Sequence, residues 1–201
     1  MSLQVIGAGL PRTGTSSLNR ALEYLLGGRG YHMSVIPGHP FDLGPSWDSA
    51  LADKMPNWDT VFDGFTSAVD WPASMFWREL SDAYPDAPVV LSVRDSAETW
   101  VQSLEATILP VAREALAPDW NNGRGLLILF ERFTGTQQWD DPTILKAAYD
   151  RHNDEVRNSV PAHRLVDWRP TDGWQPICDA LELPVPDMPF PWINKRDDWG
   201  K

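Results

Sequence analysis

Residues 3–20 read LQVIGAGLPRTGTSSLNR and contain the pattern that decides the fold. An apolar segment over Leu3–Ala8 leads into a turn rich in glycine, threonine and serine, and a helical segment over Ser16–Leu26 follows at once. This order predicts a strand, a tight loop and a helix. Such a loop presents backbone N–H groups and the positive end of a helix dipole to an anion. The sequence therefore predicts a binding site for a phosphate or sulfate group.

Two nucleotide-binding motifs come close to this loop, and neither fits. A dinucleotide fingerprint has the form G-x-G-x-x-G, and Gly7 and Gly9 supply its first two glycines, but Arg12 occupies the third position. A triphosphate-binding loop has the form G-x-x-x-x-G-K-[ST]. Gly9 and Gly14 have that spacing, but Thr15 stands in place of the lysine. Because that lysine holds the β- and γ-phosphates, its absence favours a ligand without a γ-phosphate. The cation of this loop is Arg12.

Length and composition indicate a globular protein. We expect residues 1–201 to form one domain, because 201 residues suffice for a single hydrophobic core. The single cysteine, Cys178, excludes a disulfide framework and a cysteine-based metal cluster, and it fits a reducing compartment. Neither a signal peptide nor an apolar run of about 18 residues is visible. We therefore expect a cytoplasmic protein that does not bind a membrane.

The formal net charge is −11, which argues against nucleic acid and anionic membranes as partners because long-range forces would be repulsive. A small anionic ligand is still compatible with this charge. Charges more than about 8 Å away are largely screened at physiological salt, so the arginines and amides close to the ligand determine whether a small anion binds.

Short β-branched runs alternate with helical segments along the chain. This alternation predicts an α/β fold, a three-layer sandwich with a mostly parallel central sheet of about five strands. Residues 184–201 are expected to form an extended tail, since four prolines lie between Pro184 and Pro191. The expected strands are Leu3–Ala8, Gly30–Val35, Thr60–Asp63, Val89–Val93 and Arg164–Asp167. The expected helices are Ser16–Leu26, Trp47–Lys54, Pro72–Ala83, Ala97–Leu116, Gly125–Phe133, Pro142–Ser159 and Gly173–Leu181.

A second motif, VVLSVRDSAETWVQS, spans residues 89–103. A buried strand is expected to end at Arg94, and a strand-end arginine at the ligand edge of a parallel sheet is well placed to bind a second anionic group. Ser103 follows about two and a half helical turns later and is expected to face the same group. Two ordinary alternatives remain: an Arg94–Asp95 surface pair with an incidental serine, and a first loop that is only a helix cap formed by Thr15 or Ser16.

Together, PRTGTSSL and VVLSVRDSAETWVQS resemble the two cofactor signatures of the sulfotransferase superfamily. The resemblance implies a fold like that of the P-loop nucleoside triphosphate hydrolases and a transferase that uses 3′-phosphoadenosine 5′-phosphosulfate (PAPS). Arg94 and Ser103 would then bind the 3′-phosphate of PAPS or of its product, 3′-phosphoadenosine 5′-phosphate (PAP). Ser96 is a reserve for Ser103, because the spacing is longer than usual. The residues implied for the 5′-phosphosulfate are Pro11, Arg12, Thr13, Gly14, Thr15, Ser16 and Ser17.

The resemblance further implies in-line transfer of a sulfuryl group to a hydroxyl or amine of a small-molecule acceptor, without a metal. Arg12 and the loop amides would stabilise the charge that develops on the leaving phosphate. Asp70 is the first candidate for the base that deprotonates the acceptor, and His32 is the second. The alternatives are that Asp70 caps a helix starting at Pro72 and that His32 is a packed, hydrogen-bonded histidine.

Two rival functions stay open at this stage. One is a nucleotide or nucleoside kinase with a degenerate loop, in which Asp63 would bind Mg²⁺. The other is a non-catalytic module that binds PAPS or PAP. Lys195 and Arg196 are expected to be solvated, with closure over the 3′-phosphate as the alternative. The acceptor and the oligomeric state are not predicted.

Overall fold

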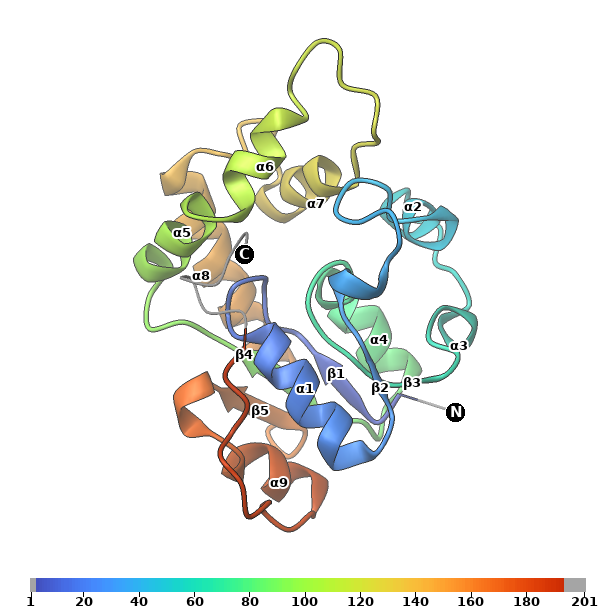
Figure 1. The fold of residues 1–201 in the computed structure, drawn as a ribbon, viewed down its shortest axis with the longest axis vertical. Helices are drawn as coiled ribbons and strands as arrows, with labels where there is room; N and C mark the ends of the chain where they lie inside the picture. The colour runs from blue at the N-terminus through green and yellow to red at the C-terminus, as the bar shows by residue number, and fades with distance from the viewer. Residues whose placement is uncertain (1–2, 194–201) are drawn as a thin grey trace.

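A computed structural model describes residues 3–193, and within them five strands form one sheet in the order β2-β3-β1-β4-β5 (Figure 1). All neighbouring strands are parallel, which confirms the predicted α/β fold. The first strand lies at the centre, so the loop that follows it opens at the middle of the sheet edge. The strands are β1 (Val5–Gly7), β2 (Arg29–Tyr31), β3 (Phe65–Ala68), β4 (Val89–Ser92) and β5 (Leu165–Trp168).

Both faces of the sheet are buried, as its continuous apolar strands require. Successive residues of a strand point to opposite faces. Val5 and Val90 pack into a core with α1 and α9, whereas Ile6 and Leu91 pack into the larger core on the other face. The sheet therefore lies between two helical layers, with α1 and α9 together on one side (Figure 1).

The helices mostly follow the predicted segments, and α8 has the predicted bounds. Asp141 accepts hydrogen bonds from the N–H groups of Thr143 (2.7 Å) and Ile144 (3.2 Å), and Pro142 occupies the first turn of α8. The α-helices are α1 (Thr15–Leu26), α2 (Pro45–Leu51), α3 (Trp58–Val61), α4 (Trp77–Ala83), α5 (Ala97–Glu105), α6 (Ile108–Glu114), α7 (Gly125–Thr134), α8 (Pro142–Ser159) and α9 (Gln175–Leu181). Short 3₁₀ turns occupy Met33–Val35, Ala73–Phe76 and Pro170–Asp172.

The predicted strand Thr60–Asp63 is wrong. The side chain of Asn57 accepts a hydrogen bond from the N–H of Thr60 at 3.2 Å and starts the short helix α3 instead. Gly64 then adopts φ +80°, and the strand begins one residue later, at Phe65. The β-branched composition of the predicted segment was outweighed by a local cap.

Other segments differ from the prediction in length. The predicted helix Pro72–Ala83 is a 3₁₀ turn over Ala73–Phe76 followed by α4, and the predicted helix Trp47–Lys54 is α2, over Pro45–Leu51. The predicted strand Gly30–Val35 stops at Tyr31, because His32 turns the chain by accepting a hydrogen bond from the N–H of Ser34. The predicted helix Ala97–Leu116 is split into α5 and α6. Pro110 lies in the first turn of α6 and has no N–H to continue the hydrogen-bond ladder from α5. This break allows α6 to lie beyond the sheet edge, beside α7 (Figure 1).

Residues 184–193, the described part of the predicted tail, form neither helix nor strand. The indole N–H of Trp174 donates to the carbonyl of Met188 at 2.9 Å, and Phe190 packs against Trp168 and Trp174. The segment is thereby fastened over β5 and α9. In the part of the chain described here, no helix is long and apolar enough to cross a membrane.

Candidate active site

The loop between β1 and α1 is shaped by two residues in the left-handed region, Arg12 (φ +68°) and Gly14 (φ +95°). A Cβ at Gly14 would lie 2.4 Å from Cγ of Pro170, so a glycine is required there for close approach as well as for conformation. Gly14 is also the N-cap of α1, and within residues 3–193 no side chain caps this helix. The alternative of a threonine or serine cap is therefore wrong. The first amides of α1 are left to bind a ligand.

Side-chain hydrogen bonds on the side away from the cavity hold the loop between β1 and α1 in place. The indole N–H of Trp100 donates to the carbonyl of Pro11 at 2.8 Å. The hydroxyl of Thr13 lies 2.6 Å from the carbonyl oxygen of Leu10 and 2.6 Å from the hydroxyl of Ser92 on β4. Thr13 is fully buried and does not line the cavity, so its side chain supports the loop rather than facing a ligand.

Arg12, Arg94 and Ser103 are brought together at this loop. Nε of Arg12 and Nη2 of Arg94 both donate to Oγ of Ser103, each at 3.3 Å. Nε of Arg94 also donates to the backbone carbonyl of Arg12 at 2.5 Å, which couples the two arginines directly. Ser103 is buried and lies behind the arginines instead of lining the cavity. The reserve candidate Ser96 caps α5 by accepting the N–H of Thr99.

The guanidinium groups of Arg12 and Arg94 are partly buried and repel each other. Burial lowers the pKa of Arg12, the charge of Arg94 lowers it further, and Asp70 partly offsets both effects. Burial also lowers the pKa of Arg94, against the influence of Asp95. Both groups remain charged at neutral pH because arginine is so strongly basic. A ligand with negative charge would relieve this repulsion, so the cluster favours an anion.

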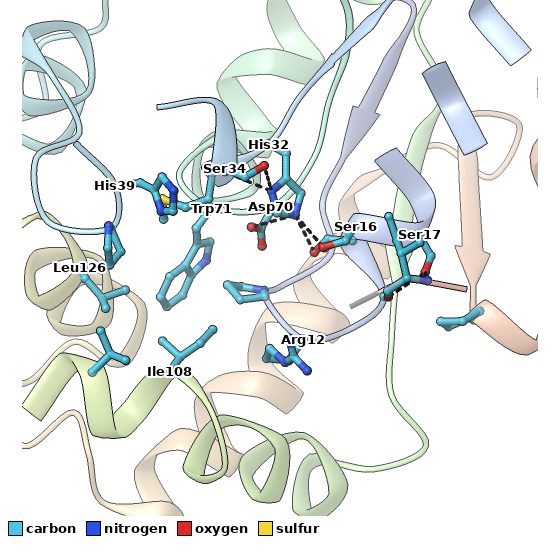
Figure 2. A pocket seen from close by; sticks show the side chains of 18 of the residues that line it. Arg12, Ser16, Ser17, His32, Ser34, His39, Asp70, Trp71, Ile108 and Leu126 are labelled. Atoms are coloured by element: carbon cyan, nitrogen blue, oxygen red, sulfur yellow. Dashed lines mark hydrogen bonds and ion pairs between the residues drawn. The ribbon is translucent and has the colours of Figure 1, made fainter. Parts of the chain in front are cut away.

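Asp70 and His32 form a pair at the mouth of the same loop (Figure 2). Nε2 of His32 lies 3.2 Å from Oδ2 of Asp70, with the hydroxyls of Thr15 and Ser16 at 3.4 and 3.3 Å from the same nitrogen. The backbone N–H of Ser34 donates to Nδ1 of His32 at 3.2 Å. Since an N–H can only donate, neutral His32 carries its proton on Nε2 and donates it to Asp70. The alternative for Asp70 does not hold, because its side chain does not cap a helix. His32 lines the cavity, but both of its ring nitrogens are hydrogen-bonded, as its alternative expected.

In the pair of Asp70 and His32, Asp70 has the more unusual environment for an ionisable group. Its side chain is buried, and its Oδ1 has no hydrogen-bond partner among the described residues. Burial raises its pKa above the ordinary carboxyl range, with His32 partly offsetting the effect. A carboxylate made more basic and holding a vacant acceptor position is suited to receive a proton.

These groups face a cavity of about 430 Å³. One wall, called here the anion wall, is the loop with Arg94; its residues are Pro11, Arg12, Gly14, Thr15, Ser16, Ser17 and Arg94. The opposite wall, called the apolar wall, consists of Met33, Pro40, Trp71, Ile108, Val111 and Leu126. At the edge, Ser17 bonds with both backbone groups of Ile193, donating to its carbonyl at 3.3 Å and accepting its N–H at 3.1 Å.

The apolar wall is the part of the site that the sequence did not reveal. Trp71 lines the cavity, whereas the buried Trp77 does not. Ile108, Val111 and Leu126 come from α6 and α7 and carry no motif. Only the break at Pro110 and the packing of α6 and α7 place them there.

Other residues singled out in the sequence lie elsewhere. Asp63, the magnesium ligand of the kinase hypothesis, is exposed in the turn before β3 and does not line the cavity. Among residues 3–193 there is no group of three or more side chains suited to hold a metal ion. Lys195 and Arg196 lie outside the described residues.

Comparison with known proteins gives two matches of note. A family model described as a sulfotransferase domain matches residues 4–199. A protein of Aspergillus versicolor named Ava biosynthesis cluster protein M is 32% identical, over 97% of this chain and 82% of its own length. With nearly its whole length matched by the family model, the chain belongs to the sulfotransferase domain family.

Proposed function

We propose that this protein transfers a sulfuryl group from PAPS to a small-molecule acceptor. The observation that carries the proposal is the convergence of Arg12 and Arg94 on one serine hydroxyl, beside the uncapped start of α1. Two partly buried cations and a helix N-terminus form a site for a ligand with several negative charges. PAPS has them at two separate positions, the 5′-phosphosulfate and the 3′-phosphate.

The residues of the anion wall fit this donor. Gly14, at φ +95° and packed against Pro170, lets the loop turn directly into α1, whose first turn carries no capping side chain among the described residues. Arg94, with Ser103 behind it, is assigned to the 3′-phosphate, and Arg12 to the bridging region of the phosphosulfate. Bound PAPS supplies the sulfuryl group, and PAP is the product that leaves.

In this proposal Arg12 is a catalytic residue. Its guanidinium and the first amides of α1 stabilise the negative charge that develops on the leaving phosphate oxygen. They are already oriented before the reaction, because Trp100 and Arg94 hold the backbone of the loop. Preorganised donors of this kind contribute about 10²–10³ each to a turnover rate.

Asp70 is proposed as the base. Its carboxylate lines the cavity and takes the proton of the acceptor, and its Oδ2 also accepts the Nε2–H of His32. Both ring nitrogens of His32 are already bonded, so His32 is assigned to positioning Asp70 rather than to removing the proton itself. This division keeps the order in which the sequence analysis ranked the two candidates, with Asp70 first and His32 second.

The test is a comparison of ligands followed by an assay of transfer. Thermal shifts are measured with PAP, with ATP–Mg²⁺ and with NAD, and transfer is assayed with ³⁵S-labelled PAPS and a panel of alcohols and amines. We expect PAP to stabilise the native protein most. Arg94→Ala should remove this stabilisation, whereas Arg20→Ala, on the exposed face of α1, should keep it.

Each other result points to a rival. A larger shift with ATP–Mg²⁺ supports the kinase, and a shift with NAD alone supports a dinucleotide site. Binding of PAP with no transfer to any acceptor supports a non-catalytic module.

A further inference from the structure

Arg94 lies two residues beyond the end of β4, which stops at Ser92. The N–H of Val93 still donates to the sheet, to the carbonyl of Trp168 at 2.9 Å. The N–H of Arg94 donates instead to the hydroxyl of Tyr149 on α8, at 2.8 Å. The same hydroxyl lies 3.4 Å from the carbonyl oxygen of Arg94. A side chain therefore takes over from the sheet in fixing the backbone from which the Arg94 guanidinium extends.

Tyr149 itself is not placed to touch a ligand in the cavity. It is 3% exposed and does not line the cavity, whereas Arg94 does. Burial raises the pKa of Tyr149, and the N–H of Arg94 partly offsets this effect, so the hydroxyl keeps its proton at neutral pH. Any influence of this hydroxyl on a ligand in the cavity has to pass through Arg94.

Helix α8 is fixed at the ends of both central strands. Nε2 of His152 lies 2.7 Å from the carbonyl oxygen of Ala8, the residue after β1. Because a carbonyl oxygen can only accept, the histidine donates from this nitrogen. His152 and Tyr149 are three residues apart and share one face of α8. This face meets the ends of β1 and β4, which are neighbours in the sheet, so the bond at Ala8 helps to set where Tyr149 meets β4.

The ring of Tyr149 also contacts the side chain that supports the first loop. It lies against Trp100 of α5, with the ring centroids 4.8 Å apart and the planes inclined by 31°. Helices α5 and α8 pack side by side (Figure 1). The indole N–H of Trp100 donates to the carbonyl of Pro11, and Nε of Arg94 donates to the next carbonyl in the chain. Both groups that bond to the loop after β1 are therefore in contact with Tyr149.

We propose that Tyr149 is a positioning residue, which holds the backbone of Arg94 in place for binding the 3′-phosphate of PAPS. This inference rests on the proposed function and adds to it a residue outside the cavity. Without the hydroxyl, the N–H of Arg94 loses its partner, and the short segment between β4 and α5 can shift. The amides at the start of α1 do not depend on that bond, so the site for the 5′ group should keep its geometry.

The test compares native protein with Tyr149→Phe by calorimetric titration of PAP and of adenosine 5′-phosphate, which lacks the 3′-phosphate. Phenylalanine keeps the ring against Trp100 and removes only the hydroxyl, so the variant is expected to fold. We expect the affinity for PAP to fall about two- to tenfold, and the affinity for adenosine 5′-phosphate to change less than about twofold. An equal loss for both ligands, or no loss for PAP, would overturn the inference.

Tyr84→Phe is the matched control. Tyr84 is also buried, its hydroxyl donates to Oδ1 of Asp59 at 3.0 Å, and it does not line the cavity. Thermal unfolding of both variants measures the general effect of losing a buried tyrosine hydroxyl. We expect Tyr84→Phe to leave both ligand affinities unchanged. A similar loss of PAP affinity in the two variants would indicate a general loosening of the fold and would contradict the role of Tyr149.

The double variant Tyr149→Phe with Arg94→Ala tests the route of the effect. In Arg94→Ala no guanidinium is left for Tyr149 to position, so adding Tyr149→Phe should change PAP affinity less than about twofold. If the second substitution weakens PAP binding as much as it does in native protein, Tyr149 acts by a route other than Arg94 and the inference is refuted.

Hydrogen exchange of native protein provides a measurement that needs no variant. The amide of Arg94 should exchange slowly because it is bonded to Tyr149, and more slowly still when PAP is bound. Exchange at the rate of an unprotected amide in both states would contradict the proposed hydrogen bond.

The titrations of native protein come first. If native protein does not bind PAP more tightly than adenosine 5′-phosphate, the proposed function fails and this inference fails with it. If native protein has this preference and Tyr149→Phe retains it in full, only this inference is contradicted.

Discussion

Replacing Asp70 by asparagine should abolish turnover and at the same time stabilise the protein. The asparagine Oδ1 can still accept the Nε2–H of His32, which Asp70 accepts at 3.2 Å, so the local geometry is retained. The base is lost, and a positioned general base contributes about 10²–10⁴ to the rate. We therefore expect kcat to fall by about 100- to 10,000-fold, with the affinity for PAP nearly unchanged.

The gain in stability follows from the sign of the pKa change. Burial raises the pKa of Asp70 in the fold, which means that the charged carboxylate lowers the free energy of unfolding at pH 7. An unpaired buried group costs about 1–3 kcal/mol, and more when it is charged. Removing the charge should raise the free energy of unfolding by about 1 kcal/mol, which corresponds to a rise of about 2–4 °C in Tm for a chain of this size.

The assay is thermal unfolding of the native protein and the variant from pH 8 down to pH 3, beside kcat at each pH, with Asp63→Asn as the exposed control. At a pH above the raised pKa of Asp70, the charged carboxylate lowers the free energy of unfolding by the full amount. This loss of stability disappears as the pH falls below the ordinary carboxyl pKa of 3.8. The native kcat should decline over the same range as the base becomes protonated. A kcat within a fewfold of native, or a variant less stable than native at pH 7, would refute this reasoning.

Four further substitutions probe the anion wall and Ser103 behind it. Arg12→Ala should lower kcat by about 10²–10³ and PAP affinity much less, because the charge that Arg12 stabilises develops during the reaction. Arg94→Ala should instead lower PAP affinity about 10- to 100-fold. If titration and kinetics show that both substitutions change only the affinity, and equally, the separate roles of the two arginines are contradicted. Gly14→Ala should lower the free energy of unfolding by about 2–5 kcal/mol in denaturant titrations, because φ is +95° and the new Cβ would lie 2.4 Å from Pro170; a change below about 1 kcal/mol would show that the loop relaxes freely. Ser103→Ala should weaken PAP binding about two- to tenfold by calorimetry, since both guanidiniums lose the hydroxyl that they share at 3.3 Å; unchanged affinity would mean that the serine does not position them.

The parts of the fold that follow local rules could be predicted from the sequence. Asp141 and Pro142 mark the start of α8 unambiguously, and the buried apolar runs mark β1 and β4. Where a cap competes with β-branched residues, as Asn57 does before Thr60, composition gives the wrong element. A hydrogen bond from one side chain is enough to change the outcome, and its formation depends on the surrounding fold.

The same distinction applies to the site. The residues of the anion wall form two contiguous motifs, so their proximity to one another follows from the rule that parallel sheets bind ligands at their carboxyl edge. The apolar wall is assembled from the segment after β2, from the residue after Asp70, and from α6 and α7, and no sequence spacing relates these parts. The unpaired state of Asp70 Oδ1 and Trp71 Nε1 is likewise a property of packing and is invisible in the sequence.

The central claim is that the loop after β1 and Arg94 together bind a nucleotide with separate 5′ and 3′ anionic groups. Calorimetric titration of PAP and of adenosine 5′-phosphate tests it most directly, because the two ligands differ only in the 3′-phosphate. We predict that native protein binds PAP about 10- to 100-fold more tightly than adenosine 5′-phosphate, and that Arg94→Ala brings the two affinities to the same level. Equal affinities in the native protein, or a preference for PAP that survives Arg94→Ala, would contradict the claim.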